Sequence, residues 1–330
     1  MRRNVISILL ISILMLGCAR PKAPIADVSL NSTNYTIETQ EIESFWDAYD
    51  RLSNSTDSSL TFQELYLDRA SPYFKEFLKL RGFKANEYVQ LVRTMPEFWK
   101  SIRPLTENVQ NRKSELQPAF DKLKELYPAF KQPDVCFAIG TLRTGGTTSE
   151  SLILIGTEIV AADNAVNISE FDNDDFMKLV LKNQTGDIIG VVAHEAVHTQ
   201  QPGGDNGDES LLKPTIVEGA ADFIASLMLG RITQSKVIYD YGIEHEKELW
   251  SEFYSDVKNG KSIDNTDWMY DYRTNRTNRP ADLAYFIGFK ICEEYYNNAR
   301  DKTQAIKDII MMSDAESFLL KSGYTEKYSS

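Results

Sequence analysis

The residues of this chain best suited to chemistry are two histidines and a glutamate in the stretch His194-Glu195-Ala196-Val197-His198. On an α-helix, side chains four residues apart lie only about 40° apart around the axis, so His194 and His198 would project side by side. Two neutral imidazoles at that spacing can bind one Zn²⁺, and Glu195 between them can accept the proton of a metal-bound water. The motif therefore predicts a hydrolytic site with one zinc ion per chain.

The surrounding sequence predicts that this stretch is helical, with an apolar back and a polar front. The face opposite the histidines carries Ile188, Ile189, Val192, Ala193 and Ala196. Pro202 and the two glycines after it are expected to end the helix just beyond the site. The alternative interpretation is that both histidines lie on the surface of an ordinary helix and bind nothing.

A second stretch, 20 residues after the second histidine, could complete the site. Pro214 is expected to begin a helix in which Glu218 and Asp222 share one face and apolar residues occupy the other. Packed antiparallel to the first helix, it would bring Glu218 to the metal as a third ligand. Asp222 would then accept a hydrogen bond from the second ring nitrogen of a ligand histidine. The alternative for Glu218 is a solvated carboxylate favoured by the helix dipole.

His-Glu-x-x-His followed by Glu-x-x-x-Asp resembles the gluzincin branch of zinc metallopeptidases. With Ile139 and the Gly-Gly-Thr-Thr stretch at 145–148, the pattern resembles a family of bacterial predicted zinc-dependent proteases related to gliding-motility-associated envelope lipoproteins. The resemblance covers residues 133–323 and matches the N-terminal helices only loosely. The metzincin pattern is excluded because position 204 is glycine, not a third histidine.

The resemblance assigns roles to particular residues. It implies that His194, His198 and Glu218 are the zinc ligands, that Glu195 is the general base, and that water holds the fourth position. It further implies that an extended peptide pairs with a strand at the sheet edge above the active-site helix, a role we expect for residues 152–155.

Gluzincins usually also place a tyrosine or histidine, downstream of the third ligand, where it stabilises the oxyanion of the tetrahedral intermediate. Nothing in the sequence chooses among the candidates for this role, which are His245, Tyr270, Tyr272 and Arg279. His245 shares a helical stripe with Tyr241 and Leu249 and is equally well explained as a partly buried core histidine.

Apolar periodicity elsewhere predicts an α+β protein that is mostly helical. Residues 37–132 follow helical periods and carry no recognisable chemistry, whereas 135–139 and 152–155 are apolar runs of strand length. The glycine-containing stretch between those runs predicts that they form a hairpin or a looped strand pair, and the chain beyond residue 171 is mostly helical again. We therefore expect a helical N-terminal region at 37–132, followed by a zincin-like metallopeptidase domain at 133–330 with a small sheet and an active-site helix.

The first 36 residues are expected to be a targeting segment. Two arginines precede an apolar run of about twelve residues, which is too short to span a bilayer. The run ends in Leu16-Gly17-Cys18, which resembles the lipobox of bacterial lipoproteins. This implies a signal peptide at 1–17, an acylated Cys18 and a tether at 18–36. The alternatives to acylation of Cys18 are an uncleaved anchor or a soluble secreted protein. No acidic run follows Cys18, which favours an outer-membrane protein facing the periplasm.

The net charge bears on which partners the chain can bind, and the cysteine content bears on whether it contains a disulfide. The chain has 48 acidic against 36 basic residues, and a formal charge of −12 disfavours binding to nucleic acid. The two remaining cysteines, Cys136 and Cys292, either pair in an oxidising compartment or stay as buried free thiols.

Two functional hypotheses follow. The first is a lipid-anchored zinc metallopeptidase that hydrolyses peptide bonds of a peptide or protein substrate in the bacterial envelope, through a zinc-bound water activated by Glu195. The second is a non-catalytic assembly or binding lipoprotein that retains the zincin scaffold within an envelope protein complex. The glutamate between the histidines favours the first hypothesis, because a scaffold has no use for a general base.

Overall fold

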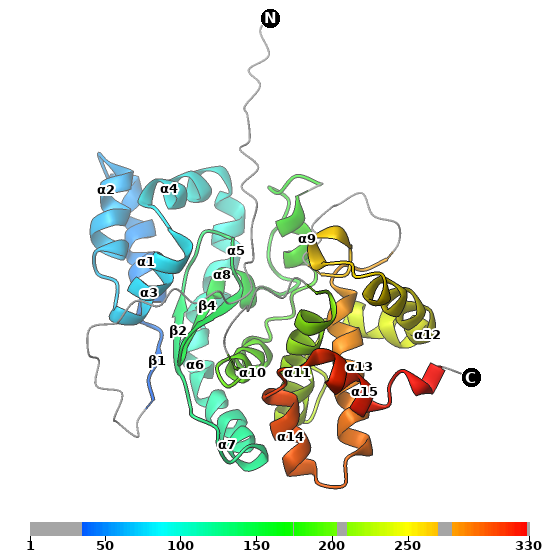
Figure 1. Cartoon of the computed structure of the whole chain (residues 1–330). Helices are drawn as coiled ribbons and strands as arrows, with labels where there is room; N and C mark the ends of the chain where they lie inside the picture. Colours follow the sequence, from blue (N-terminus) through cyan, green and yellow to red (C-terminus); the bar gives the residue numbers. More distant parts are fainter. Residues whose placement is uncertain (1–34, 174, 203–209, 270–278, 329–330) are drawn as a thin grey trace, which may run out of the picture.

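A small mixed sheet lies between an N-terminal and a C-terminal group of helices in the computed structural model of the chain (Figure 1). The structure describes residues 35–173, 175–202, 210–269 and 279–328. In spatial order the strands of the sheet are β1 (Ile37–Glu38), β2 (Asp134–Ala138), β4 (Leu152–Gly156) and β3 (Gly146–Ser149).

Strand order corrects one expectation from the sequence. Strand β2 pairs with β1 and β4 in parallel, so the runs 135–139 and 152–155 form a looped parallel pair and not a hairpin. The antiparallel partner of β4 is β3, which lies within the stretch that links those runs. The prediction that residues 152–155 form the sheet edge is wrong, because β4 is an inner strand and β3 is the edge. The physical reason is composition: Leu-Ile-Leu-Ile needs burial on both faces, whereas the Gly-Thr-Thr-Ser of β3 tolerates partial exposure.

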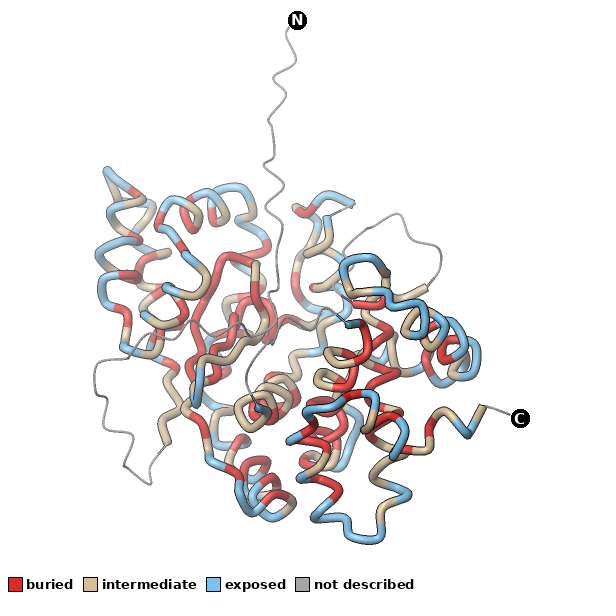
Figure 2. The backbone as a smooth tube through the Cα atoms, in the orientation of Figure 1, coloured by how far each residue is buried: buried red, intermediate tan, exposed pale blue. Residues whose placement is uncertain are grey.

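The N-terminal helices pack on the sheet and share its core. Their bounds are α1 (Gln40–Arg51), α2 (Ser58–Phe62) continued by η2 (Gln63–Leu67), α3 (Pro72–Arg81), α4 (Ala85–Thr94), α5 (Pro96–Glu107), α6 (Val109–Arg112) and α7 (Leu116–Leu126). Helices α1 and α3 contact β2, and Ile37 of β1 pairs with Val135. Buried side chains from this region and from the rest of the chain form one continuous apolar cluster. Figure 2 shows buried stretches in the sheet and in both groups of helices.

The remaining α-helices follow the sheet in the chain. They are α8 (Thr157–Val160), α9 (Phe176–Lys182), α10 (Ile188–His198), α11 (Leu212–Leu229), α12 (Lys236–Lys258), α13 (Leu283–Asn298), α14 (Lys302–Ile310) and α15 (Ala315–Ser322). Helix α10 packs on the sheet against β3 and β4, α11 packs between α10 and α13, and the later helices pack on one another. The expected apolar backs of α10 and α11 are buried, which places their polar residues toward a shared front.

Two glycines let α11 and α13 cross with their backbones almost in contact. A Cβ atom on Gly219 would lie 2.0 Å from the carbonyl carbon of Gly288, and one on Gly288 would lie 1.8 Å from the Thr215 carbonyl oxygen. No side chain larger than hydrogen fits at either position. Because Gly219 directly follows Glu218, this crossing also fixes where the carboxylate-bearing turn of α11 lies.

The cysteines and the targeting segment can be placed against the described residues. Cys136 in β2 and Cys292 in α13 are buried free thiols, so the pairing alternative is wrong. The predicted signal peptide, Cys18 and nearly all of the tether lie outside the described residues. Within the part of the chain that the structure describes, no helix is long and apolar enough to cross a membrane.

The glycine crossing yields a stability prediction. We expect Gly219→Ala to lower the free energy of unfolding by about 1–3 kcal/mol, because the added methyl group collides with the α13 backbone. In an open helical position the same change would raise stability by about 1 kcal/mol. Urea unfolding of the two proteins, followed by circular dichroism, measures the difference. A variant as stable as the parent would contradict the close crossing.

Candidate metal centre

The site is built on two antiparallel helices that contact each other along their polar fronts. Asp187 accepts a hydrogen bond from the Gly190 amide at 2.9 Å and so caps the start of α10. The same carboxylate pairs with Arg231, just beyond the end of α11, at 2.6 Å. Further along, His194 contacts α11 at Asp222, and His198 contacts it one turn earlier, at Glu218. The start of α10 therefore lies beside the end of α11, as the sequence predicts.

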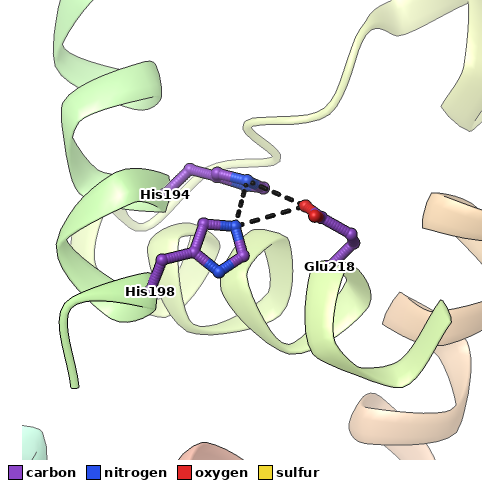
Figure 3. Close-up of side chains that lie close together, drawn as sticks. All are labelled: His194, His198 and Glu218. Carbon is purple, nitrogen blue, oxygen red and sulfur yellow. Dashed lines mark hydrogen bonds and ion pairs between the residues drawn. The ribbon is translucent and has the colours of Figure 1, made fainter. Parts of the chain in front are cut away.

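Three ligand-type atoms meet between these helices (Figure 3). The Nε2 atoms of His194 and His198 are 3.0 Å apart. Oε2 of Glu218 lies 3.3 Å from the first and 3.2 Å from the second. Donors about 2.0 Å from a tetrahedral ion are separated from one another by about 3.3 Å, so the triangle has the size that a zinc ion requires. The structure thus brings together the three residues that the sequence singles out as ligands.

Both histidines have their other ring nitrogen committed to an acceptor. Nδ1 of His194 lies 2.7 Å from Oδ1 of Asp222, and Nδ1 of His198 lies 2.7 Å from Oε1 of Gln201. Gln201 donates from Nε2 to the Val217 carbonyl at 2.9 Å, which fixes its oxygen toward His198. When a ring is neutral, its Nδ1 donates to this acceptor and its Nε2 lone pair faces the shared point. In that state three acceptor atoms face one point, which is the arrangement that a metal cation needs.

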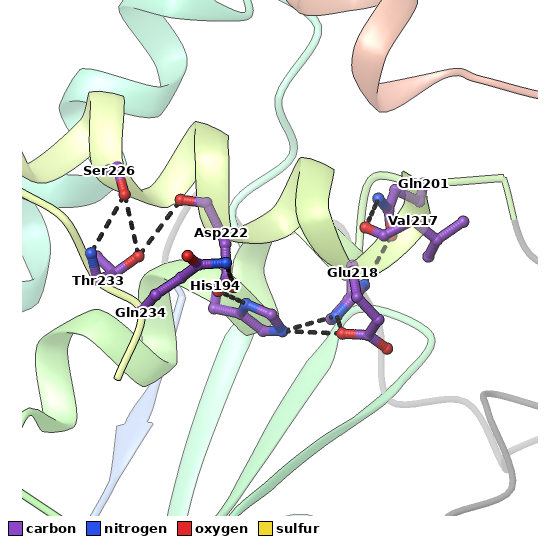
Figure 4. Close-up of polar contacts among 9 residues, drawn as sticks. His194, Gln201, Val217, Glu218, Asp222, Ser226, Thr233 and Gln234 are labelled. Atoms are coloured by element: carbon purple, nitrogen blue, oxygen red, sulfur yellow. Dashed lines mark hydrogen bonds and ion pairs between the residues drawn. The ribbon is translucent and has the colours of Figure 1, made fainter. Parts of the chain in front are cut away.

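The hydrogen bonds continue outward from Asp222 (Figure 4). Its Oδ2 accepts from Nε2 of Gln234 at 2.8 Å, and its backbone carbonyl accepts from the Thr233 hydroxyl at 3.3 Å. The Asp222 side chain is buried, and both of its carboxylate oxygens have hydrogen-bond partners, His194 and Gln234. This is the supporting position that the sequence predicts for Asp222, since it orients the ring of His194.

The electrostatics of the cluster favour positive charge. Burial lowers the pKa of His194, but Asp222 and Glu218 outweigh it and hold that pKa well above its ordinary value. Burial likewise lowers the pKa of His198, and Glu218 more than reverses the effect. The pKa of Glu218 itself is lowered, because the two histidines outweigh the opposing effect of burial. The cluster therefore attracts a cation and keeps Glu218 ionised.

The carboxylate of Glu195 lies against the edge strand β3. A Cβ atom on Gly146 of β3 would lie only 2.4 Å from Oε1 of Glu195, so the strand backbone rests directly against the carboxylate. Burial raises the pKa of Glu195, and the positive charges of His198, His194 and Arg81 only partly offset that effect. A carboxyl group with a raised pKa, next to a cluster of metal-ligating atoms, is suited to accept and return a proton.

An aromatic residue beside the cluster escaped the sequence reasoning. The ring of Tyr285 in α13 lies 6.4 Å from the His194 ring, with an angle of 23° between the two planes. Tyr285 is three residues before Gly288, so the close α11–α13 crossing brings it to the site. Its sequence signal is weak, because it lies in an otherwise apolar helix that resembles core packing.

The earlier candidates for an oxyanion-stabilising group have other contacts. His245 lies at a kink in α12, is half-buried, stacks on Tyr241 with ring centroids 4.1 Å apart and contacts the Tyr241 carbonyl through Nδ1. Arg279 lies over the Trp268 ring and pairs with Glu252. Tyr270 and Tyr272 lie outside the described residues.

Two glutamines were also not assigned roles from the sequence. Gln201 carries a detectable signal, because it lies three residues after His198 and on the histidine side of the helix. Gln234 carries none, because it reaches Asp222 from the connection between α11 and α12.

Comparison with known proteins identifies the family. Residues 26–326 match the model of the family described as gliding motility protein GldB, a family of lipoproteins, and the chain belongs to this family. The relation to gliding-motility lipoproteins expected from the sequence is thus confirmed, and the family indicates a lipoprotein of the cell envelope. No curated protein and no solved structure matches the chain significantly.

The ligand triangle predicts a specific metal-content result. We expect the purified chain to hold about one zinc ion and Glu218→Ala to lose it, because two imidazoles alone leave the tetrahedron half filled. Glu248→Ala on α12 is a matched control, since that glutamate is exposed and remote in sequence from the cluster. Inductively coupled plasma mass spectrometry after dialysis reports the metal. Equal metal content in the two variants would remove Glu218 from the ligand set.

The supporting hydrogen bonds predict a smaller effect. Asp222→Ala and Gln201→Ala should each weaken zinc affinity by about 10- to 100-fold without abolishing binding, because each leaves one ligand ring free to turn. Competition against a chromophoric zinc chelator measures the change. An unchanged affinity in either variant would show that its histidine needs no such acceptor.

Proposed function

We propose that this lipoprotein is a zinc metallopeptidase of the bacterial envelope, of gluzincin type. The observation that carries the proposal is that three acceptor atoms, from His194, His198 and Glu218, converge close to Glu195. Glu195 lies on α10, the helix that packs against the edge strand β3. A structural metal site would be closed by a fourth protein ligand, whereas three ligands leave a position for water and substrate. Among the described residues the ligand group contains His194, His198 and Glu218 alone.

The proposed chemistry divides among named residues. A zinc ion held by His194, His198 and Glu218 would act as a Lewis acid toward the scissile carbonyl and lower the pKa of the attacking water. Glu195 would take the proton of that water and pass it to the leaving amine, for which its raised pKa is suited. The hydroxyl of Tyr285 is our candidate for stabilising negative charge on the carbonyl oxygen, because its ring lies beside His194.

The substrate would bind as an extended peptide along β3. Within the described residues, β4 pairs with β3 on one side and no strand pairs with it on the other. An extended chain could therefore add its backbone hydrogen bonds along the outer edge of β3, which passes directly over Glu195. This layout of a small sheet, an edge strand and a metal-bearing helix is the one that a zincin-like core needs.

The proposed location is the outer membrane, anchored through Cys18 and facing the periplasm. The family match supports an envelope lipoprotein, and the absence of an acidic run after Cys18 favours the periplasmic face. The family description also favours a second candidate function, a non-catalytic component of a gliding-related envelope complex that retains the scaffold. Peptide or protein substrates belong to the first candidate and assembly partners to the second.

Replacing the proposed base separates these two candidates. We expect Glu195→Gln to keep zinc and to lose peptide hydrolysis by at least about 100-fold, because the amide cannot accept the proton of the water. Incubation with a mixture of fluorescence-quenched peptides, followed by mass spectrometry, measures cleavage. Glu248→Gln on α12 should cleave like the parent protein.

The two candidates predict different outcomes of that experiment. Cleavage by the parent and by Glu248→Gln, but not by Glu195→Gln, would support the peptidase. Undiminished cleavage by Glu195→Gln would mean that the assigned base is wrong. A zinc-loaded parent that cleaves no peptide in the mixture would favour the non-catalytic component.

A further inference from the structure

The connection between β2 and β3 is unusual because it is a loop that lies inside the protein. Of residues 139–145, all but Arg143 and Gly145 are buried. Leu142 in this loop has φ of 57°, a backbone conformation that is unfavourable for a leucine and persists only where the surroundings impose it. A buried loop also needs internal partners for its backbone amides and carbonyls.

Two tyrosines of the N-terminal helical region supply the first of these partners. Tyr66 of η2 donates its hydroxyl hydrogen to the Ile139 carbonyl at 2.6 Å and accepts from the Ile139 amide at 3.0 Å. Tyr88 of α4 donates to the same carbonyl at 3.0 Å. Both tyrosines are fully buried, and neither takes part in the proposed chemistry.

A buried carboxylate supplies the next partners along the loop. Glu158 of α8 is fully buried, and its two oxygens accept from the amides of Gly140 and Leu142 at 2.8 and 3.0 Å. The strained residue of the loop is therefore fixed through its own amide. Each backbone group named here lies within seven residues of Gly146, where the strand meets Glu195.

The far end of β3 is tied to the N-terminal helices as well. Ser149, the last residue of the strand, donates its hydroxyl hydrogen to Oε1 of Glu76 in α3 at 2.9 Å. The N-terminal region thus holds the start of the loop that leads into β3, at Ile139, and the last residue of the strand, at Ser149. Between those two points lies Gly146, with its backbone against the Glu195 carboxylate.

We propose that the N-terminal helical region, together with Glu158 of α8, forms part of the peptide cleft by holding the edge strand in place over Glu195, with Tyr66, Tyr88 and Glu158 as positioning residues. The role rests on the proposed function, since the strand held in this way is the one that would pair with a peptide. It follows that the helices are not a separable pro-segment or an inhibitor of residues 133–330.

The test removes a single hydroxyl group. In Tyr66→Phe the Ile139 amide loses its acceptor inside the protein, so we expect backbone amides of residues 142–149 to exchange with deuterium at least about tenfold faster. Zinc content should stay at the parent value, because the ligands lie on α10 and α11. If the parent cleaves peptides, KM should rise by more than kcat falls, since Glu195 and the ligands are intact.

Matched variants separate positioning from general stability. Tyr295→Phe removes one hydroxyl bound to Asp308 in the C-terminal helices and should leave exchange at 142–149 unchanged. Glu158→Gln is a second variant, with one amide acceptor lost and shape conserved, for the case that Tyr66→Phe does not fold.

The outcomes distinguish this inference from the proposed function. Faster exchange confined to 142–149 in Tyr66→Phe or Glu158→Gln supports the inference, even if no peptide is cleaved by the parent. Exchange that is unchanged there, or that rises equally across the whole chain, overturns it. Absence of cleavage by the zinc-loaded parent counts against the peptidase only.

Discussion

The Nδ1 atoms of His194 and His198 each lie 2.7 Å from a fixed oxygen, and the rest of the proposed metal site depends on these two contacts. Asp222 and Gln201 lie on opposite sides of the pair, one on α11 and one just beyond α10. When both rings are neutral and donate from Nδ1, two lone pairs and the Glu218 carboxylate face one point, which is the arrangement that a metal cation needs. The antiparallel register of α10 and α11 creates this arrangement, because it sets His198 against Glu218 and His194 against Asp222.

Glycines at three positions let backbone segments approach closely around the site, and these contacts maintain the register of α10 and α11. Gly219 and Gly288 let α13 press against α11 next to Glu218, which also brings the Tyr285 ring beside His194. Gly146 lets the edge strand rest on Glu195. On the other side of the sheet the N-terminal helices hold that strand through buried polar groups. Helices α10 and α11 therefore carry Glu195 and the proposed ligands, and the N-terminal region positions the strand that contacts Glu195.

Much of this arrangement follows from sequence, because it depends on local spacing. The helical period places His194 beside His198 and Glu218 beside Asp222, and the apolar backs of the two helices indicate that they pack together. Strand order could not be predicted in the same way. Apolar content identifies residues 152–155 as a strand but does not indicate which strands pair with it, and the edge strand is β3. Tyr285 and Gln234 were missed for a related reason, since contacts between distant segments depend on how helices cross and leave no periodic signal.

The chain belongs to the family described as gliding motility protein GldB, and the geometry gives that family a metal-binding hypothesis to test. The most direct test is X-ray absorption spectroscopy at the zinc edge on the purified protein. The account predicts a first shell of two imidazole nitrogens and carboxylate or water oxygens at about 2.0–2.1 Å. A protein that takes up no zinc when zinc is supplied, or a shell containing sulfur at about 2.3 Å, would contradict it.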